Sequence, residues 1–412
     1  MNVSSFIAKR VAFSHQHSFS NFIIKLATAA TALSVAAMIL TVAFVNGFQQ
    51  TVGSKIFNFW GHLRISEYEP DKSLVAEDTP IPPNDTVVQI LKTTTGVIQV
   101  QSVATKSAVI EKNKEIEGVL FKGVDSNYNF NNLSSFLVSG TWPNLSDSLY
   151  SKEILVSKPV ADELLINVND TINIFFIAPE TSSASVRKLR VSGIYKTGIG
   201  EFDGSMVIGD IRLLRRIYKW QHNEIGAYEV FLNDYKNIDS VNRLIAEQKQ
   251  LPGIWRSQSI RQVYPFIFDW LNIQDVNRNV VFVVMSLVAI INLITCLLIL
   301  VLERTKMVGI LKASGGSNWT IQQIFLYHAA IISGRGILIG LLAGVGIALL
   351  QQYTGFIKMD ETAYYVRTAP VELVWWHVAL ICLGTLVVCF IALLLPTLFV
   401  RSIKPVSAIQ FK

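Results

Sequence analysis

The chain has 412 residues, of which 51% are hydrophobic and only 16% are charged, and its mean hydropathy is +0.40. This balance excludes an ordinary soluble domain, because soluble domains of this length carry about a quarter charged residues. The formal net charge is +6, and its placement along the chain is more informative than its size.

Four long apolar runs follow one another along the chain. The first contains a single charge, Lys25, the second, Val280–Leu302, contains none, and the third contains Arg335 near its middle. A helix needs about 20 apolar residues to cross the hydrocarbon, so each run is long enough to span a membrane. The expected transmembrane helices cover 22–48, 278–302, 321–350 and 373–400. The first run is too long for a usual signal-peptide core and lacks a small-x-small cleavage site, which favours a retained helix.

The basic residues fix the expected orientation, because short cytoplasmic segments are enriched in Lys and Arg. Three segments are positively charged, and all three lie on the same side of the four runs: the N-terminal arm 1–21, the loop 303–320 and the tail 401–412. These segments are therefore predicted to be cytoplasmic. Residues 49–277 and the loop 351–372 are predicted to lie outside.

The large external segment has a mixed α/β pattern and no cysteine. All three cysteines of the chain fall in the apolar runs, so an internal disulfide in this segment is excluded. Alternating or β-branched stretches predict strands, and 3.6-residue periodicity predicts helices. The strands are Ile154–Ser157, Ile172–Ile177, Leu189–Ile194 and Tyr228–Leu232, and the helices are Val87–Thr93, Val160–Leu165, Ile211–Tyr218 and Ile238–Gln248. Between two strands, the polar stretch Ala178–Val186 predicts a hairpin tip.

The fold class expected from these patterns is a membrane α-helical protein with four transmembrane helices. A large mixed α/β extracytoplasmic domain is inserted between the first and second helices.

The first run is apolar on every face near its outer end, where Phe44, Val45 and Phe48 lie. Such a helix meets lipid, other helices or a lipid-like ligand, and periodicity does not choose among these.

The cytoplasmic loop 303–320 contains a second candidate interaction site. Met307, Ile310 and Leu311 are spaced i, i+3 and i+4, so a short helix there carries one apolar face. Gly315 and Gly316 favour its termination. A helix held between two membrane spans can act as a lever for another protein. It can equally be an ordinary loop helix lying on lipid headgroups, and both interpretations stay open.

The third run carries Gly336, Gly340, Gly344 and Ala348 at four-residue spacing. A stripe of small residues lets two helix backbones approach closely, which predicts a helix-packing face. Arg335 lies beside the stripe and is expected to have a structural role facing protein.

Sequence motifs of catalysis are absent. The chain contains no G-x-x-x-x-G-K-[ST], no H-E-x-x-H and no C-x-x-C. Ser185–Lys188 and Lys196–Gly198 match the penicillin-binding patterns S-x-x-K and K-T-G, but they are too close together for that site. We expect no catalytic residue, no metal site and no bound cofactor in this chain.

Several stretches resemble the FtsX-like (MacB-type) ABC transporter permeases, and within them the lipoprotein-releasing LolC/LolE group. The turn ERTKMVGILKASGGS, beginning at Glu303, is similar to the wider superfamily. The stretches that are similar to the lipoprotein-releasing group are SSFIAKRVAF, AFVNGFQQTV, GHLRI, VSGIYKTGIGEFDGSMVIGDI and IKPVSAIQFK.

The resemblance implies a bacterial inner-membrane permease that pairs with itself or a paralogue and binds two copies of an ABC ATPase, which holds ATP and Mg²⁺. It implies that the 303–320 segment is the coupling helix, with Lys306, Met307, Ile310, Leu311 and Ser314 as contact residues. It also implies a periplasmic domain with a porter-like part and a β-rich part inserted at about 114–218. Lipoprotein substrate would pass Phe44, Val45 and Phe48, and a periplasmic chaperone would dock at a hairpin around Glu180, Thr181, Ser182 and Ser183. Membrane lipid is the other expected partner, and nucleic acid is not one.

Three alternatives share this layout: a MacB-type exporter of peptides or drugs, a mechanical signaller that activates a periplasmic cell-wall hydrolase, and a membrane-anchored interaction protein without an ATPase.

Overall fold

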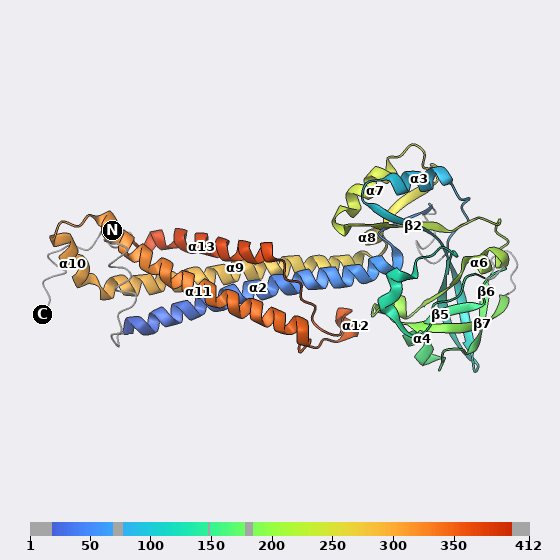
Figure 1. Ribbon diagram of the computed structural model, residues 1–412, viewed down its shortest axis with the longest axis horizontal. Coiled ribbons are helices and arrows are strands. Elements are labelled where there is room, and N and C mark those ends of the chain that lie inside the picture. The colour runs from blue at the N-terminus through green and yellow to red at the C-terminus, as the bar shows by residue number, and fades with distance from the viewer. Residues whose placement is uncertain (1–18, 69–76, 147–148, 178–183, 398–412) are drawn as a thin grey trace. The chain divides into compact units, whose positions relative to one another are not determined.

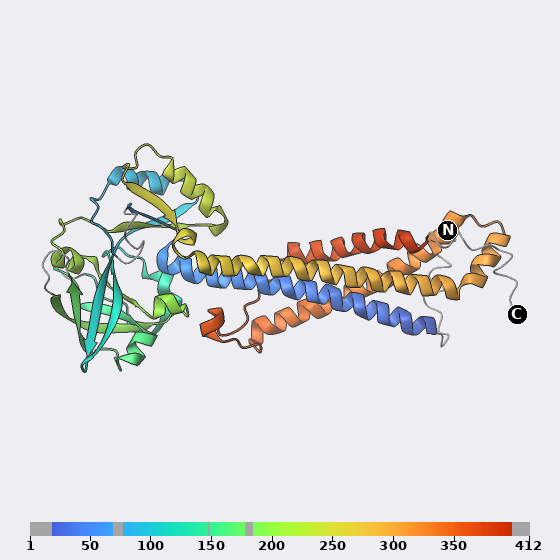
Figure 2. The same ribbon diagram turned by 180° about the vertical axis from the view of Figure 1, so that it is seen from behind.

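The structure, a computed structural model, describes residues 19–68, 77–146, 149–177 and 184–397. The chain divides into two compact units. The helical unit comprises Met1–Gln50, Trp270–Lys358 and Thr368–Lys412, and the sheet unit comprises Thr51–Asp269 and Met359–Arg367. Figures 1 and 2 show the elements of both units from opposite sides.

Among the described residues, four helices are long and apolar enough to cross a membrane. They are α2 (Phe19–Trp60), α9 (Pro265–Glu303), α11 (Asn318–Thr354) and α13 (Trp375–Thr397). The helix α2 continues past its predicted end at 48, and α9 begins well before its predicted start at 278. Hydropathy missed these turns because they are less apolar and pack against protein rather than lipid: Phe57 stacks on Phe268 within the sheet unit.

Two buried clusters hold the helical unit together. One joins α2, α9, α11 and α13 through residues such as Ala27, Leu297, Phe325 and Cys389. The other is built around Val35, Ile39, Ile337 and Ile381. Where these helices meet through apolar side chains, close packing is what distinguishes contact with a helix from contact with lipid.

The described strands of the sheet unit form one continuous ten-stranded sheet, in the order β10-β1-β9-β2-β3-β8-β5-β7-β4, with β6 pairing with β2 and β7. The strands are β1 (Leu63–Glu67), β2 (Val97–Lys112), β3 (Glu115–Val124), β4 (Leu137–Gly140), β5 (Glu153–Ser157), β6 (Thr171–Ile177), β7 (Ala184–Tyr195), β8 (Met206–Asp210), β9 (Ala227–Leu232) and β10 (Trp255–Ser259). The part expected as an insertion at 114–218 thus shares hydrogen bonds with the rest of the unit.

Strand β2 makes this continuity possible because it is 16 residues long. Its first half pairs with β9 and its second half with β6, while β3 lies along its other edge. A two-residue turn joins β2 to β3, and both turn residues, Asn113 and Lys114, have positive φ. That geometry matches the right-handed twist of the paired strands and fixes their register.

Short helices accompany the strands of the sheet unit, and α3 packs on β2, α6 on β3 and α7 on β10. They are α3 (Asp85–Thr93), α4 (Lys158–Glu163), α5 (Gly200–Asp203), α6 (Ile211–Ile217), α7 (Ile238–Ala246), α8 (Ile260–Val263) and α12 (Glu361–Tyr364), with short 3₁₀ helices at Phe130–Phe136 and Tyr235–Asn237. All four predicted strands and all four predicted helices are confirmed. The predicted hairpin tip was too long, because Ala184–Val186 already pairs with β6 as part of β7.

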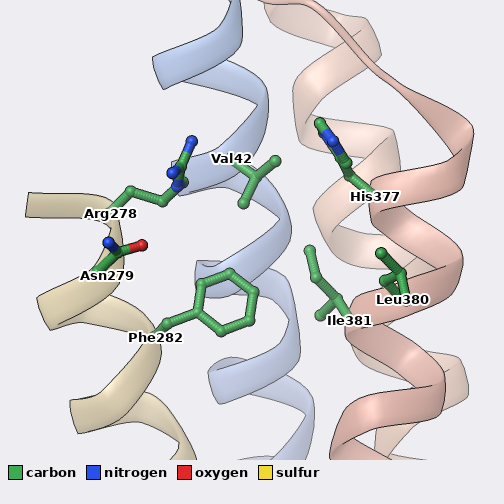
Figure 3. Close-up of a pocket in the computed structure, with 7 residues that line it drawn as sticks. All are labelled: Val42, Arg278, Asn279, Phe282, His377, Leu380 and Ile381. Atoms are coloured by element: carbon green, nitrogen blue, oxygen red, sulfur yellow. The ribbon is translucent and has the colours of Figure 1, made fainter. Parts of the chain in front are cut away.

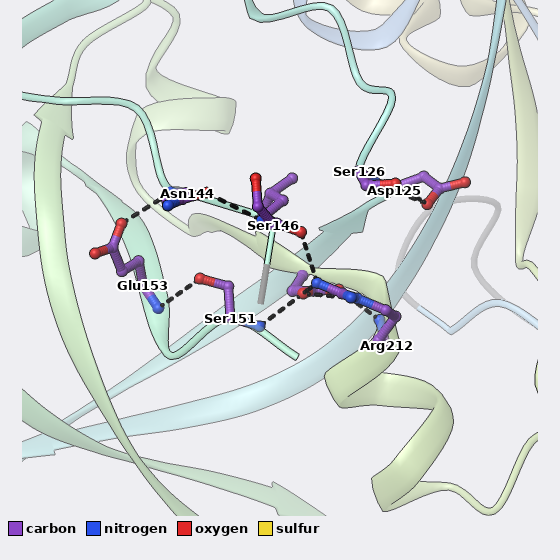
Figure 4. A network of polar contacts seen from close by, with 9 residues as sticks. Asp125, Ser126, Asn144, Ser146, Ser151, Glu153 and Arg212 are labelled. Carbon is purple, nitrogen blue, oxygen red and sulfur yellow. Dashed lines mark hydrogen bonds and ion pairs between the residues drawn. The ribbon is translucent and has the colours of Figure 1, made fainter. Parts of the chain in front are cut away.

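A loop between β4 and β5 is fastened to β8 by the carboxylate of Asp210 and to α6 by the guanidinium of Arg212. Figure 4 shows Arg212 beside the loop residues. Asp210 Oδ2 accepts a hydrogen bond from Ser151 N at 2.7 Å, and Arg212 Nη2 donates to the Leu145 carbonyl at 2.7 Å. Glu153 accepts from Asn144 N at 2.8 Å. These bonds satisfy loop backbone groups that a strand would otherwise pair.

Four charged side chains form a buried ionic cluster at the centre of the sheet unit: Arg64, Asp78, Lys122 and Glu229, none more than 6% exposed. Arg64 contacts Asp78 at 2.5 Å and Glu229 at 3.6 Å, and Lys122 contacts Glu229 at 2.8 Å. Lys122 Nζ also donates to the carbonyl of Phe59 in the last turn of α2, at 2.5 Å. Two cations thus face two anions, so the cluster is neutral as a whole.

Candidate functional site

A pocket of about 370 Å³ opens between α2, α9 and α13 in the helical unit. Its volume lies at the small end of the range for ligand pockets, roughly 300–1,000 Å³. The lining residues are Val42, Arg278, Asn279, Phe282, His377, Leu380 and Ile381. Figure 3 shows them converging on one space, with the polar side chains toward one end and Phe282, Leu380 and Ile381 toward the other.

The polar end is held by contacts with neighbouring side chains. Arg278 forms an ion pair with Asp275 at 2.8 Å on the same helix. His377 Nδ1 lies 3.0 Å from Asn46 Nδ2, which joins α13 to α2. The apolar end belongs to a buried cluster that includes Val42 and Ile381, with Phe282 packed against it. A pocket with a cation and amides at one end and hydrocarbon at the other suits an amphiphile.

The residues expected on the lipoprotein path lie on the same helix as Val42 but do not line this pocket. Val45 is buried at 6% exposure. The ring of Phe48 packs edge-on against Trp270 of α9, with centroids 6.1 Å apart, and Phe44 is half-buried. The sequence analysis did not single out Arg278 or Asn279, although polar residues just before an apolar run are a usable signal.

The expected coupling segment forms the helix α10 (Thr305–Ala313). Its predicted contact residues divide between two faces. Met307 and Leu311 pack against the buried cluster of the helical unit, together with the fully buried Val308. Ile310 is 58% exposed, and it shares a face with the exposed Lys306 and Ser314 at i, i+4 and i+8. The three apolar residues expected to share one face are therefore divided: Met307 and Leu311 contact the helix's own bundle, and only Ile310 remains exposed for a partner.

The glycine stripe of α11 lies directly against α2. A Cβ atom at Gly340 would come within 2.5 Å of the Ala32 carbonyl oxygen, and at Gly336 within 2.8 Å of Thr31 Cβ. At Gly344 the nearest atom would be Ala36 Cα at 3.1 Å. A side chain does not fit at Gly336 or Gly340 and is tightly restricted at Gly344, so the two backbones are in contact along the stripe.

Two other expectations, the chaperone hairpin and the absence of a metal site, stay predictions. The hairpin residues Glu180, Thr181, Ser182 and Ser183 lie outside the described residues. Within the described ranges, no group of three or more His, Cys, Asp or Glu side chains is placed to hold a metal ion.

Two protein-family models match most of the chain between them. The MacB-like periplasmic core domain matches residues 26–248, more than half of the chain, and the FtsX-like permease C-terminal domain matches 279–405. The chain is an FtsX-like permease with a MacB-like periplasmic core domain. The resemblance stated from the sequence is confirmed. The FtsX-like permease is thus a transmembrane protein, and its sheet unit corresponds to the periplasmic domain.

Curated relatives of this FtsX-like permease extend over almost its whole length. The lipoprotein-releasing system transmembrane protein LolC of Neisseria meningitidis is 22% identical over 416 residues, covering 96% of both chains. LolE of Haemophilus influenzae is 22% identical and covers 94% of both chains. Among solved structures, the extracellular domain of the transporter YknZ matches 48% of this chain and 99% of its own at 17% identity and a TM-score of 0.32. The periplasmic region of MacB from Actinobacillus actinomycetemcomitans matches 50% and 91% at 12% identity and a TM-score of 0.34.

Proposed function

We propose that this chain is the permease subunit of an ABC transporter that extracts outer-membrane-directed lipoproteins from the inner membrane and passes them to a periplasmic chaperone. The observation that carries the proposal is the end-to-end similarity to the LolC and LolE proteins, which spans both membrane and periplasmic parts at 94–96% of each chain. An exporter that shared only the fold would have less reason to match them from end to end.

The energetics of extraction support a separate ATPase. Each buried CH₂ group of an acyl chain contributes about 0.8 kcal/mol, so removing a lipoprotein anchor from a bilayer costs tens of kcal/mol. The chain has no P-loop and cannot draw that energy from its own ATP site. A partner ATPase, binding ATP and Mg²⁺, would deliver it through the exposed face of α10. In this proposal α10 and both termini are cytoplasmic, and a second permease, identical or paralogous, completes the assembly.

The amphiphilic pocket supports the substrate class. An acyl chain is recognised by buried area, which Phe282, Leu380 and Ile381 supply. The polar end offers Arg278 and Asn279 to the head of the same molecule. We include Phe44, Val45 and Phe48 in the path toward this pocket, as the neighbouring turns of α2.

We expect Ile310→Glu to lose the ATPase partner while the chain itself accumulates normally. Ile310 is 58% exposed, so the carboxylate is harmless in the free chain but would lose its hydration in an interface, which costs several kcal/mol. Co-purification of the ATPase should fall at least about tenfold. Leu311→Glu is the matched comparison: it places a carboxylate against the helical core, so the level of the chain itself should fall. If Ile310→Glu keeps full ATPase binding, α10 lies on lipid and is not the coupling helix.

We expect a photo-crosslinking residue at Phe282 to capture lipoprotein without ATP and to release it when ATP is added. The neighbouring Val283 is 61% exposed on another face of α9 and provides the control, at which lipid should dominate. Phe282→Leu should release lipoprotein normally, and Phe282→Asp should reduce release about tenfold or more, because an unpaired carboxylate is costly in an apolar pocket. Equal capture at both positions would count against the pocket as a lipoprotein site.

The whole proposal is tested by depleting the protein in its native host. Outer-membrane lipoproteins should accumulate in the inner membrane. If lipoproteins are still sorted correctly during depletion, lipoprotein release is excluded as the function. The remaining candidates would then be export of peptides or drugs, activation of a periplasmic cell-wall hydrolase, and a role as a membrane-anchored interaction protein.

A further inference from the structure

The loop between α11 and α13 has a tip that belongs to the sheet unit. Its two arms are paired: Ala369 N donates to the Ile357 carbonyl at 3.0 Å, and Met359 N donates to the Arg367 carbonyl at 2.9 Å. The tip, Met359–Arg367, contains α12 and groups with the sheet unit, whereas the residues on either side of it group with the helices. A single paired loop therefore runs from the ends of two membrane helices into the periplasmic domain.

The tip is fastened by a carboxylate and a backbone carbonyl, each bound by a lysine of the sheet unit. Glu361 accepts from Lys196 Nζ at 2.6 Å and from Arg367 Nε at 2.9 Å. The carbonyl of Tyr365 accepts from Lys55 Nζ at 2.7 Å. Tyr365 has a φ of +60°, in the left-handed region that non-glycine residues seldom adopt. We call these contacts of Lys55, Lys196, Glu361 and Tyr365 the loop clamp.

The sequence KTGIGEFD, residues 196–203, forms the turn that positions Lys196 for the clamp. The buried carboxylate of Asp203 accepts from Thr197 N and Thr197 Oγ1 at 2.8 Å and from Gly198 N at 2.7 Å, which fixes the turn after Lys196. Gly198 has a φ of +78°, and a Cβ there would lie 2.7 Å from both Glu361 Oε1 and Lys55 Nζ. Glycine is favoured here by its backbone conformation, and a side chain at this position would also displace the charged ends of Glu361 and Lys55.

Electrostatics favour the ionised form of Glu361 in the clamp. Burial opposes the ionised form of Glu361, but the hydrogen bonds and charges of Lys196 and Arg367 outweigh it and hold the pKa of Glu361 below its ordinary value. Burial lowers the pKa of Lys55, while the charges of Glu361 and Asp203 act in the opposite direction. Both contacts are charge-assisted and partly shielded from water, which makes them stronger than exposed ion pairs.

We propose that Lys196 and Lys55 are positioning residues that hold the α11–α13 loop to the periplasmic domain, so that movement of these two helices is transmitted to it during transport. This inference rests on the proposed function, because it assigns a role in the ATP-driven cycle. The force would pass from α10 through the short turn at 314–317 into α11, and from α11 into the clamped loop. Along the chain, α2 and α9 continue directly into the sheet unit. The clamp attaches the loop that joins α11 and α13 to the same unit.

The test uses the full chain with its ATPase partner in proteoliposomes that carry a lipoprotein and an acceptor chaperone. Lys196→Cys with Glu361→Cys removes the ion pair and should slow lipoprotein release about tenfold, the usual effect of losing one charge-assisted hydrogen bond, while ATP hydrolysis continues. A short, charged, bifunctional thiol reagent that joins the two cysteines should restore release. The three natural cysteines lie in the membrane helices, out of reach of such a reagent.

The matched control is Lys158→Cys with Asp162→Cys, which removes an exposed ion pair on α4 of the same domain and should leave release unchanged with or without the reagent. Normal release by the Lys196/Glu361 variant, or a defect that the reagent does not repair, would overturn the clamp. Absence of release by the unaltered chain would instead overturn the proposed function, so the two failures are distinguishable.

Discussion

Lys122→Met is expected to destabilise the periplasmic domain by about 3–5 kcal/mol, the cost of leaving a buried charge without its partner. Lys122 and Glu229 are both 0% exposed and lie 2.8 Å apart. Burial lowers the pKa of Lys122 and raises the pKa of Glu229, and the charge of each on the other is the largest influence that opposes these shifts. The substitution also removes the donor to the Phe59 carbonyl, so the last turn of α2 loses its attachment to β3.

Hydrogen exchange of the amides in β3 and β9 measures this loss in the full-length protein. We expect exchange to accelerate by roughly a hundred- to a few-thousand-fold. Adding Glu229→Gln should recover much of the protection, because Arg64 and Asp78 then remain as a neutral pair. Lys158→Met, at an exposed ion pair, is the control. Normal protection in Lys122→Met, or no recovery in the double variant, would show that the ionic pairing does not stabilise the sheet.

Gly340→Leu is expected to disrupt the contact between α11 and α2. A Cβ at this position would lie 2.5 Å from the Ala32 carbonyl oxygen and 2.8 Å from Val35 Cβ, so the backbones must separate along the stripe. Overpacking of this kind costs about 1–3 kcal/mol or more. Gly346→Leu is a close control on the same helix, because nothing lies within 4 Å of its Cβ position. Both substitutions gain the same helix propensity, so their difference isolates the packing term.

The buried cysteines report this effect once Cys382, which is only partly buried, is replaced by alanine. Cys296 is 3% exposed and Cys389 is 1% exposed, so a fluorogenic thiol reagent reacts with them only when the helices come apart. The temperature at which they become reactive should fall for Gly340→Leu and hold for Gly346→Leu. Equal temperatures for the two variants would mean that the glycine stripe does not pack against α2 in the membrane.

The sequence determined the features that depend on a residue and its near neighbours. Hydropathy located the four membrane helices, since transfer into lipid depends on the composition of a local run. Strands β5, β6, β7 and β9 were predicted for the same reason, because their β-branched or alternating residues form a local pattern. Strands β2 and β3 were not, because they carry Gln101, Lys106 and Lys122, polar groups that a strand buries only when it has distant partners.

Only the tertiary structure decided which distant residues meet. Arg278 and His377 reach one pocket, and Lys196 meets Glu361 across 165 positions of the chain. The spacing of residues along the chain does not predict such pairs, because they are brought together only when distant segments pack against each other in the folded protein. Packing likewise decided that Leu311 faces the bundle while Ile310 stays exposed, although both are apolar and adjacent. Periodicity gives the faces of a helix, and the neighbours that fold against it determine which face remains for a partner.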